Sequence, residues 1–98
     1  KVDGIFDCCG CDLLTSLEGA PKEVGGRFDC SYCKSLKSLE GAPEKISKNF
    51  DCNSCTSLTS LEDAPKEVGG SFICYSCGAT FTIKDVKKVS KVGGEIYL

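Results

Sequence analysis

Hydrophobic residues recur along the chain with a period of 22 residues. A phenylalanine opens each of four similar segments: Phe6, Phe28, Phe50 and Phe72. A cysteine follows each phenylalanine two residues later, and the stretches 14–26 and 58–70 differ at one position only, Gly19 against Asp63. Such repetition is typical of proteins in which each repeat buries its apolar positions against its neighbours. We therefore expect a stacked array.

The residues within one repeat predict its local structure. The segment Phe-x-Cys alternates in character, as a short strand does, with Phe and Cys pointing inward. Two leucines three residues apart then turn the chain back toward the core, and a proline and a Gly-Gly pair suit a return leg and a tight corner. The repeat predicts a mainly β, parallel-strand solenoid of about four 22-residue turns, with one strand per turn.

The repeats and a C-terminal cap together form a single domain, residues 1–98. The repeats are expected at residues 2–23, 24–45, 46–67 and 68–80, and the cap at residues 81–98.

The cap has its own pattern. Thr82 followed by Asp85 is a helix-capping sequence, and apolar residues recur after it at helical spacing. We expect a short helix around 83–91 and then a final strand, which places Ile96 and Leu98 in the columns of Phe and Cys.

No comparable cap precedes Lys1. An open first strand is an edge that another chain usually covers. We therefore expect either homo-oligomeric pairing through the N-terminal edge, which would make the chain a structural or assembly module, or further repeats upstream of this sequence.

The unit V-G-G-x-F-x-C-x-x-C-x-x-L-x-x-L-E-G-A-P-K-E resembles the short leucine-rich repeats of many small bacteriophage and phage-derived bacterial proteins. The resemblance covers residues 2–80. The family's Asn-type ladder position is held here by cysteines: Cys11, Cys33, Cys55 and Cys77. The resemblance implies a horseshoe-like or nearly straight solenoid used for binding. It also suggests a phage setting, in which a small binder could inhibit a host or defence protein.

Nine cysteines and no histidine define the chemical options. Eight of the cysteines form C-x-x-C pairs: Cys8 with Cys11, Cys30 with Cys33, Cys52 with Cys55, and Cys74 with Cys77. Read alone, this spacing is typical of a zinc-binding module with these eight residues as ligands. The repeat favours two stacked columns of small apolar core residues instead.

We accordingly expect reduced thiols, with no metal and no cofactor, although disulfides between stacked cysteines are a third alternative. Reduced thiols indicate a cytoplasmic protein, located in the bacterial host cytoplasm if it is phage-encoded. Cys9 lies outside the pairs, in a column with Ser31, Asn53 and Tyr75 that we expect to be polar and outward. We interpret Cys9 as an exposed free thiol, and the alternative is a role in redox chemistry or covalent pairing.

The outward positions of the strands form the candidate partner-binding face. Its residues are Asp7, Asp29, Asp51, Arg27, Asn49, Tyr32, Ile73 and Tyr75. Three stacked carboxylates repel one another, with only Arg27 nearby to offset them, which favours a partner with a basic surface. Tyrosine is a residue type enriched among interface anchors. The alternative is a solvated face whose aspartates were copied by repeat duplication.

Charge and composition exclude other classes of partner. The formal charge is −2, from 12 basic and 14 acidic residues, which gives no basic surplus for nucleic acid or a membrane surface. No apolar run has the length of a membrane span. Without histidine or a pocket-forming insertion, we expect no enzyme. The predicted function is non-catalytic protein–protein binding through the strand face.

Overall fold

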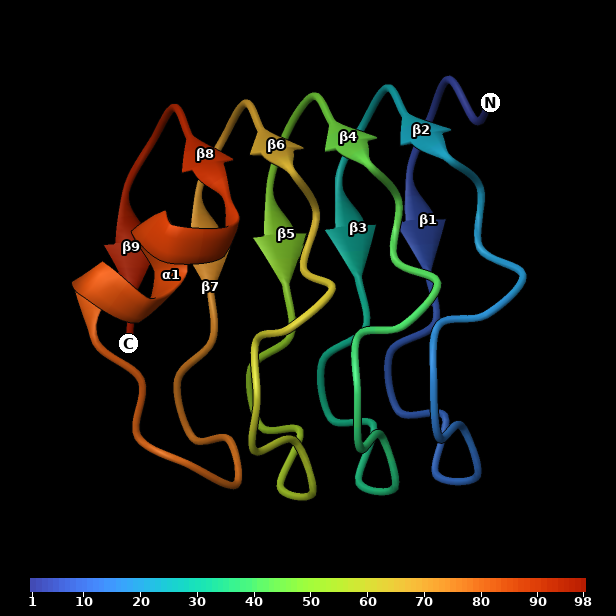
Figure 1. Cartoon of the computed structure of the whole chain (residues 1–98). Helices are drawn as coiled ribbons and strands as arrows, with labels where there is room; N and C mark the ends of the chain where they lie inside the picture. Colours follow the sequence, from blue (N-terminus) through green and yellow to red (C-terminus); the bar gives the residue numbers. More distant parts are fainter.

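A computed structural model describes all residues 1–98 and shows a solenoid (Figure 1). Each turn passes through two sheets, and the strands within each sheet are parallel. The larger sheet has the order β1-β3-β5-β7-β9, with strands Phe6–Asp7, Phe28–Asp29, Phe50–Asp51, Phe72–Ile73 and Ile96–Tyr97. The smaller sheet has the order β2-β4-β6-β8, with strands Glu23–Val24, Lys45–Ile46, Glu67–Val68 and Lys91–Val92. The expected parallel solenoid of about four turns is confirmed.

The expectation of one strand per turn is wrong, since each turn passes through both sheets. The second strand is two residues long, like the first, with an exposed charged residue followed by a buried aliphatic one, as in Glu23 and Val24. The sequence shows no alternation of the Phe-x-Cys kind in this segment, so the pattern does not predict a strand there. Their register places Glu23 beside Lys45 and Lys45 beside Glu67, so opposite charges are neighbours across the sheet.

The core lies between the two sheets and the return legs. The Phe rings follow one another up the stack, with centroids 5.0, 5.8 and 5.0 Å apart between successive pairs from Phe6 to Phe72. Phe28, Phe50 and Phe72 are fully buried. The leucines of the return legs, such as Leu36 and Leu58, close the same core, which confirms their predicted inward direction.

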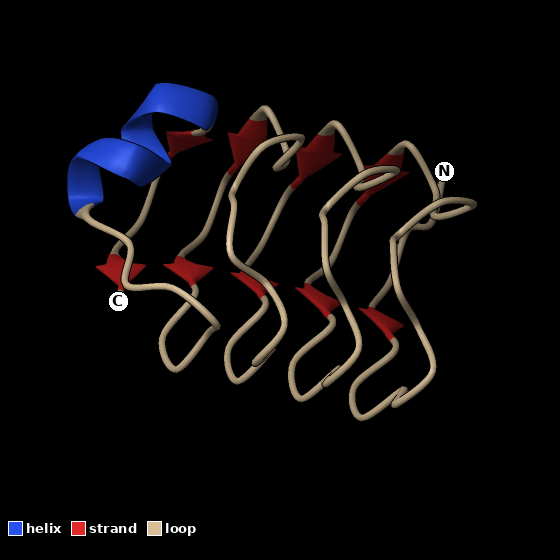
Figure 2. Cartoon of the chain, turned by 60° about the horizontal axis from the view of Figure 1, so that its bottom comes forward, coloured by secondary structure: helices blue, strands red, loops and turns tan.

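Helix α1 (Ile83–Val89) replaces the return leg of the fourth turn (Figure 2). Its predicted capping box is confirmed, because the Asp85 N–H donates to Thr82 Oγ1 at 3.1 Å and the Thr82 N–H donates to Asp85 Oδ2 at 2.9 Å. The helix ends at Val89 rather than near residue 91, since the following residues are extended and form β8.

The last turn keeps the register in spite of the helix. Phe72 pairs with Ile96, so Ile96 continues the Phe column as expected, although this step is 24 residues long instead of 22. The helix α1 has seven residues, and no helix of the protein is long and apolar enough to cross a membrane.

Candidate binding face and cysteine core

The register of the larger sheet brings the predicted outward residues into one column. Asp7 lies beside Asp29, Asp29 beside Asp51, and Asp51 beside Ile73. The column continues to Tyr97, which the sequence reasoning did not include. The signal was present, since placing Ile96 in the Phe column also places the next residue in the Asp column. The face therefore has an acidic half and an apolar half.

The apolar half of the face is exposed. Tyr97 and Tyr75 are 49% and 43% exposed, and Ile73, which pairs with Tyr97, is half-buried. Tyr32 lies in the acidic half, in the same turn as Asp29. It is 54% exposed and has a φ of 59°, a left-handed conformation that costs a bulky residue about 1–2 kcal/mol. The other copies have Gly or Ser at this position, so the backbone conformation of the turn does not require a tyrosine there.

The three aspartates also have a local structural role. In each, Oδ1 accepts a hydrogen bond from the backbone N–H two residues later, at 2.9, 2.9 and 3.0 Å for Asp7, Asp29 and Asp51. This geometry ends the strand in a side-chain-stabilised turn. Their Oδ2 atoms accept no hydrogen bond within the chain and remain available to a partner.

The expected offset from Arg27 is absent. The only ion pair within 4.0 Å joins Lys1 to Asp3, at 3.9 Å, and Arg27 is exposed. Asn49 has a structural contact instead, since its Oδ1 accepts a hydrogen bond from the Ser71 N–H at 2.8 Å. The acidic column is therefore not neutralised by a neighbouring side chain.

The column of Cys9 differs from its prediction. Cys9 and Tyr75 are exposed, but Ser31 and Asn53 are buried, at 4% and 5% exposure. Their side chains bend back onto the aspartates, with Ser31 Oγ 2.6 Å from Asp29 Oδ1 and Asn53 Nδ2 2.6 Å from Asp51 Oδ1. The outward prediction is wrong for these two because the turn directs short polar side chains toward the carboxylate.

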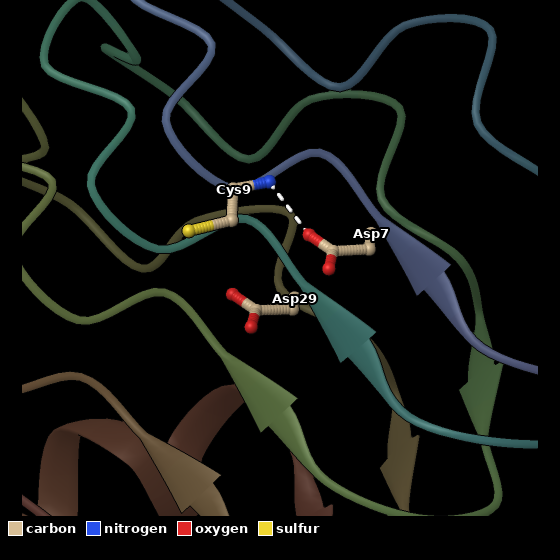
Figure 3. Close-up of side chains that lie close together, drawn as sticks. All are labelled: Asp7, Cys9 and Asp29. Atoms are coloured by element: carbon tan, nitrogen blue, oxygen red, sulfur yellow. Dashed lines mark hydrogen bonds between the residues drawn. The ribbon is translucent and has the colours of Figure 1, made fainter.

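Asp7, Cys9 and Asp29 form a compact group at the first turns of this face (Figure 3). One potential ligand atom from each lies within 4.8 Å of the others. Ser31 Oγ lies 3.3 Å from Cys9 Sγ, and the Cys9 N–H donates to Asp7. A hard carboxylate and a soft thiol prefer different metals, so the group favours no particular cation.

The paired cysteines form the two predicted columns. In the middle turns Cys30, Cys33, Cys52 and Cys55 are fully buried. The ends of the columns are less protected, with Cys8 and Cys77 half-buried and Cys11 exposed. All nine cysteines are free thiols.

Thiols of the second column bond to the backbone of the first. Cys55 Sγ donates to the Cys30 carbonyl at 3.1 Å, and Cys77 Sγ donates to the Cys52 carbonyl at 3.1 Å. A side chain that satisfies a buried carbonyl in each turn is the role expected of a ladder position. The eight paired cysteines bring no three sulfur atoms into a compact group of the kind formed by Asp7, Cys9 and Asp29, so the geometry gives the zinc alternative no support.

Burial keeps the first column protonated. It raises the pKa of Cys8 and of Cys74 from the usual 9.0 to about 12. The pKa of Cys30 and Cys52 is raised well above 9.0 by the hydrogen bonds of the neighbouring thiols and by burial. A thiol of this kind is a weak nucleophile at neutral pH.

These pKa values make stability depend on pH. A group whose pKa is raised on folding contributes stability that is complete below the unfolded pKa of 9.0 and is lost as the pH rises toward 12. We expect the urea midpoint of unfolding to fall as the pH rises above about 9. The matched control is the double variant Cys8→Val, Cys74→Val, which removes the two thiols concerned and should lose less stability over the same range. An identical loss in both proteins would show that other groups cause it.

No protein family, curated protein or solved structure matches this chain. The class of protein is therefore defined by the fold alone, as a repeat protein with a parallel β-solenoid architecture.

Proposed function

We propose that this chain is a non-catalytic protein-binding module that uses the outward face of the larger sheet. The observation that carries the proposal is the column that runs from three carboxylates to Ile73 and Tyr97, beside the exposed Tyr75. The Oδ2 atoms of the aspartates are free to accept donors, and the tyrosines offer rigid contact area. This arrangement suits a protein surface that presents basic groups next to an apolar segment.

The setting is part of the same proposal. Nine free thiols are stable in a reducing compartment, which supports a cytoplasmic location for the protein. The resemblance to phage repeats supports a host or defence protein as the partner.

The test replaces the three aspartates with asparagine. Asparagine keeps the acceptor oxygen of the turn and removes the charge, so the variant Asp7→Asn, Asp29→Asn, Asp51→Asn should fold normally. We expect it to lose at least about tenfold in affinity for the partner, since hydrogen bonds to charged groups contribute about 1.5–3 kcal/mol each. Parallel capture on the immobilised wild type and variant, followed by titration of the captured protein, measures this loss.

The chain offers a control of equal charge. Glu18, Glu40 and Glu62 are exposed and occupy one position on the return legs of the same three turns. Their triple replacement by glutamine changes the net charge by the same amount on a different side of the solenoid. The proposal fails if this control loses the partner equally, or if the asparagine variant binds it with unchanged affinity.

A further inference from the structure

In the second, third and fourth turns, the second cysteine of the C-x-x-C pair reaches back to the turn before its own. Cys55 Sγ lies 3.1 Å from the carbonyl oxygen of Cys30, although the two residues are 25 positions apart in the sequence. The same contact recurs one turn earlier and one turn later, at 3.2 and 3.1 Å. Three cross-turn pairs result: Cys8 with Cys33, Cys30 with Cys55, and Cys52 with Cys77.

The two thiols of a cross-turn pair also interact with each other. The Cys30 thiol forms a hydrogen bond with the Cys55 thiol, and the other two pairs do the same. Cys33 makes its thiol–thiol hydrogen bond with Cys8 of the preceding turn rather than with Cys30, its partner in the C-x-x-C spacing. The fold therefore pairs the cysteines differently from their spacing in the sequence.

Backbone groups hold the sulfur of the second cysteine in place. Cys55 Sγ donates to the Cys30 carbonyl and accepts a hydrogen bond from the Cys33 N–H. Cys77 Sγ accepts in the same way from the Cys55 N–H. Two reacting groups that are held side by side react far faster than separate ones. Each cross-turn pair is therefore arranged for a reaction between its two sulfur atoms.

The two thiols of a pair differ in acidity. The pKa of Cys55 and of Cys77 is lowered, chiefly by the hydrogen bond from the first-column thiol of the preceding turn. The pKa of Cys30 and Cys52 is raised by the same hydrogen bonds and by burial. The second cysteine of the pair is therefore the thiolate that meets an oxidant first. Burial raises the pKa of Cys33, so the other two pairs are the more reactive ones.

We propose that the cross-turn pairs are oxidation sites, at which a peroxide converts two core thiols into a disulfide that links successive turns. The thiolate of Cys55 attacks one peroxide oxygen, the O–O bond breaks, and a sulfenic acid forms. The released hydroxide takes up the proton that Cys55 lost. The Cys30 sulfur then attacks the sulfenic sulfur, so that the S–S bond forms, the S–O bond breaks and the oxygen leaves as water with the thiol proton. Two thiols are oxidised and one hydrogen peroxide is reduced to two waters.

A cross-turn disulfide should stabilise the array. It joins two turns that otherwise hold together through noncovalent contacts, and it links residues 25 positions apart, which restricts the unfolded chain. We expect the oxidised protein to unfold about 5–15 °C above the reduced one, and dithiothreitol to remove the difference. Thermal unfolding followed by circular dichroism measures the shift.

Trypsin separates the turns, so the pairing can be read from peptide masses. Cleavage after lysine and arginine leaves each C-x-x-C pair on its own peptide: 2–22, 28–34, 49–66 and 67–84. A disulfide between turns joins two of these peptides, whereas one within a C-x-x-C pair joins none. The protein tested carries Cys9→Ser and Cys11→Ser, because these two exposed thiols would otherwise link separate chains.

The folded protein is treated with dilute hydrogen peroxide, its remaining thiols are alkylated, and it is digested. We expect peptide 28–34 to be joined to 49–66, and 49–66 to 67–84. Adding Cys55→Ser should abolish the first of these links, although Cys52 remains on the same peptide. Cys33→Ser is the matched control, since it also removes a buried second-column thiol and should leave that link intact. Serine keeps a donor for the carbonyl, so both variants should fold, which circular dichroism checks.

Three results would overturn the proposal. The first is a link between peptides 28–34 and 49–66 that survives Cys55→Ser, because it must then use Cys52. The second is a set of disulfides confined to single peptides, which indicates pairing within the C-x-x-C spacing. The third is a folded protein whose core thiols stay free in peroxide, or reach sulfinic acid unlinked, and form cross-turn disulfides only after unfolding in urea.

Discussion

Replacing Phe50 with alanine is expected to destabilise the protein by about 3–5 kcal/mol, which is a large part of the stability of a chain this size. Phe50 is fully buried, and its ring lies between those of Phe28 and Phe72, with centroids 5.8 and 5.0 Å away. Removing it leaves a cavity in the middle of the stack and takes a neighbour from both adjacent rings. Urea unfolding followed by circular dichroism measures the loss.

Phe6→Ala is the matched control for this prediction. Phe6 occupies the same column at the open end, is half-buried, and has one ring neighbour, Phe28, at 5.0 Å. Its replacement should cost clearly less than that of Phe50, because the site is already partly solvated. Equal losses at the two positions would contradict a core that is dry in the middle and open at the first turn.

Replacing Gly41 with alanine is expected to cost about 2–5 kcal/mol, from two separate effects. Its φ of +89° is left-handed, which costs a side-chain-bearing residue about 1–2 kcal/mol. A Cβ there would also clash with the Cα and N atoms of Glu18, so the backbones of two turns would have to separate, at about 1–3 kcal/mol. Chemical unfolding gives the total.

Gly19→Ala separates the two effects. Gly19 has the same position in the preceding turn and a φ of +93°, but a Cβ there meets nothing within 4 Å. Its replacement should cost only the conformational part, about 1–2 kcal/mol. If both variants lose the same free energy, contact between successive turns does not limit the side chain at this position.

The stacked array was predictable because the same residue types recur at the same positions in every repeat. Identical spacing of Phe, Cys and Leu in every copy sets the columns, and a capping pattern at Thr82 sets the helix. The second strand of each turn, such as Glu23–Val24, carries no alternation of the Phe-x-Cys kind and was not predictable from the sequence. It forms because the stacking of neighbouring turns extends that segment.

The candidate face was predictable in its residues and less so in their contacts. The sequence placed Asp29 and Asp51 outward, but could not show that each carboxylate ends its own strand by accepting a backbone N–H. That contact also draws Ser31 and Asn53 inward. Local turn chemistry of this kind depends on backbone angles, which a repeat pattern does not specify.

The cysteine columns also make each turn separately observable. A solenoid is held together by contacts between nearest neighbours, so turns can open one at a time, starting where a turn has a single neighbour. Every full turn carries its own C-x-x-C pair of thiols, and those of the middle turns are fully buried while Cys11 is exposed. The order in which an alkylating reagent modifies the cysteines therefore reports the order in which the turns open. Each turn is resolved separately, because its thiols belong to that turn alone.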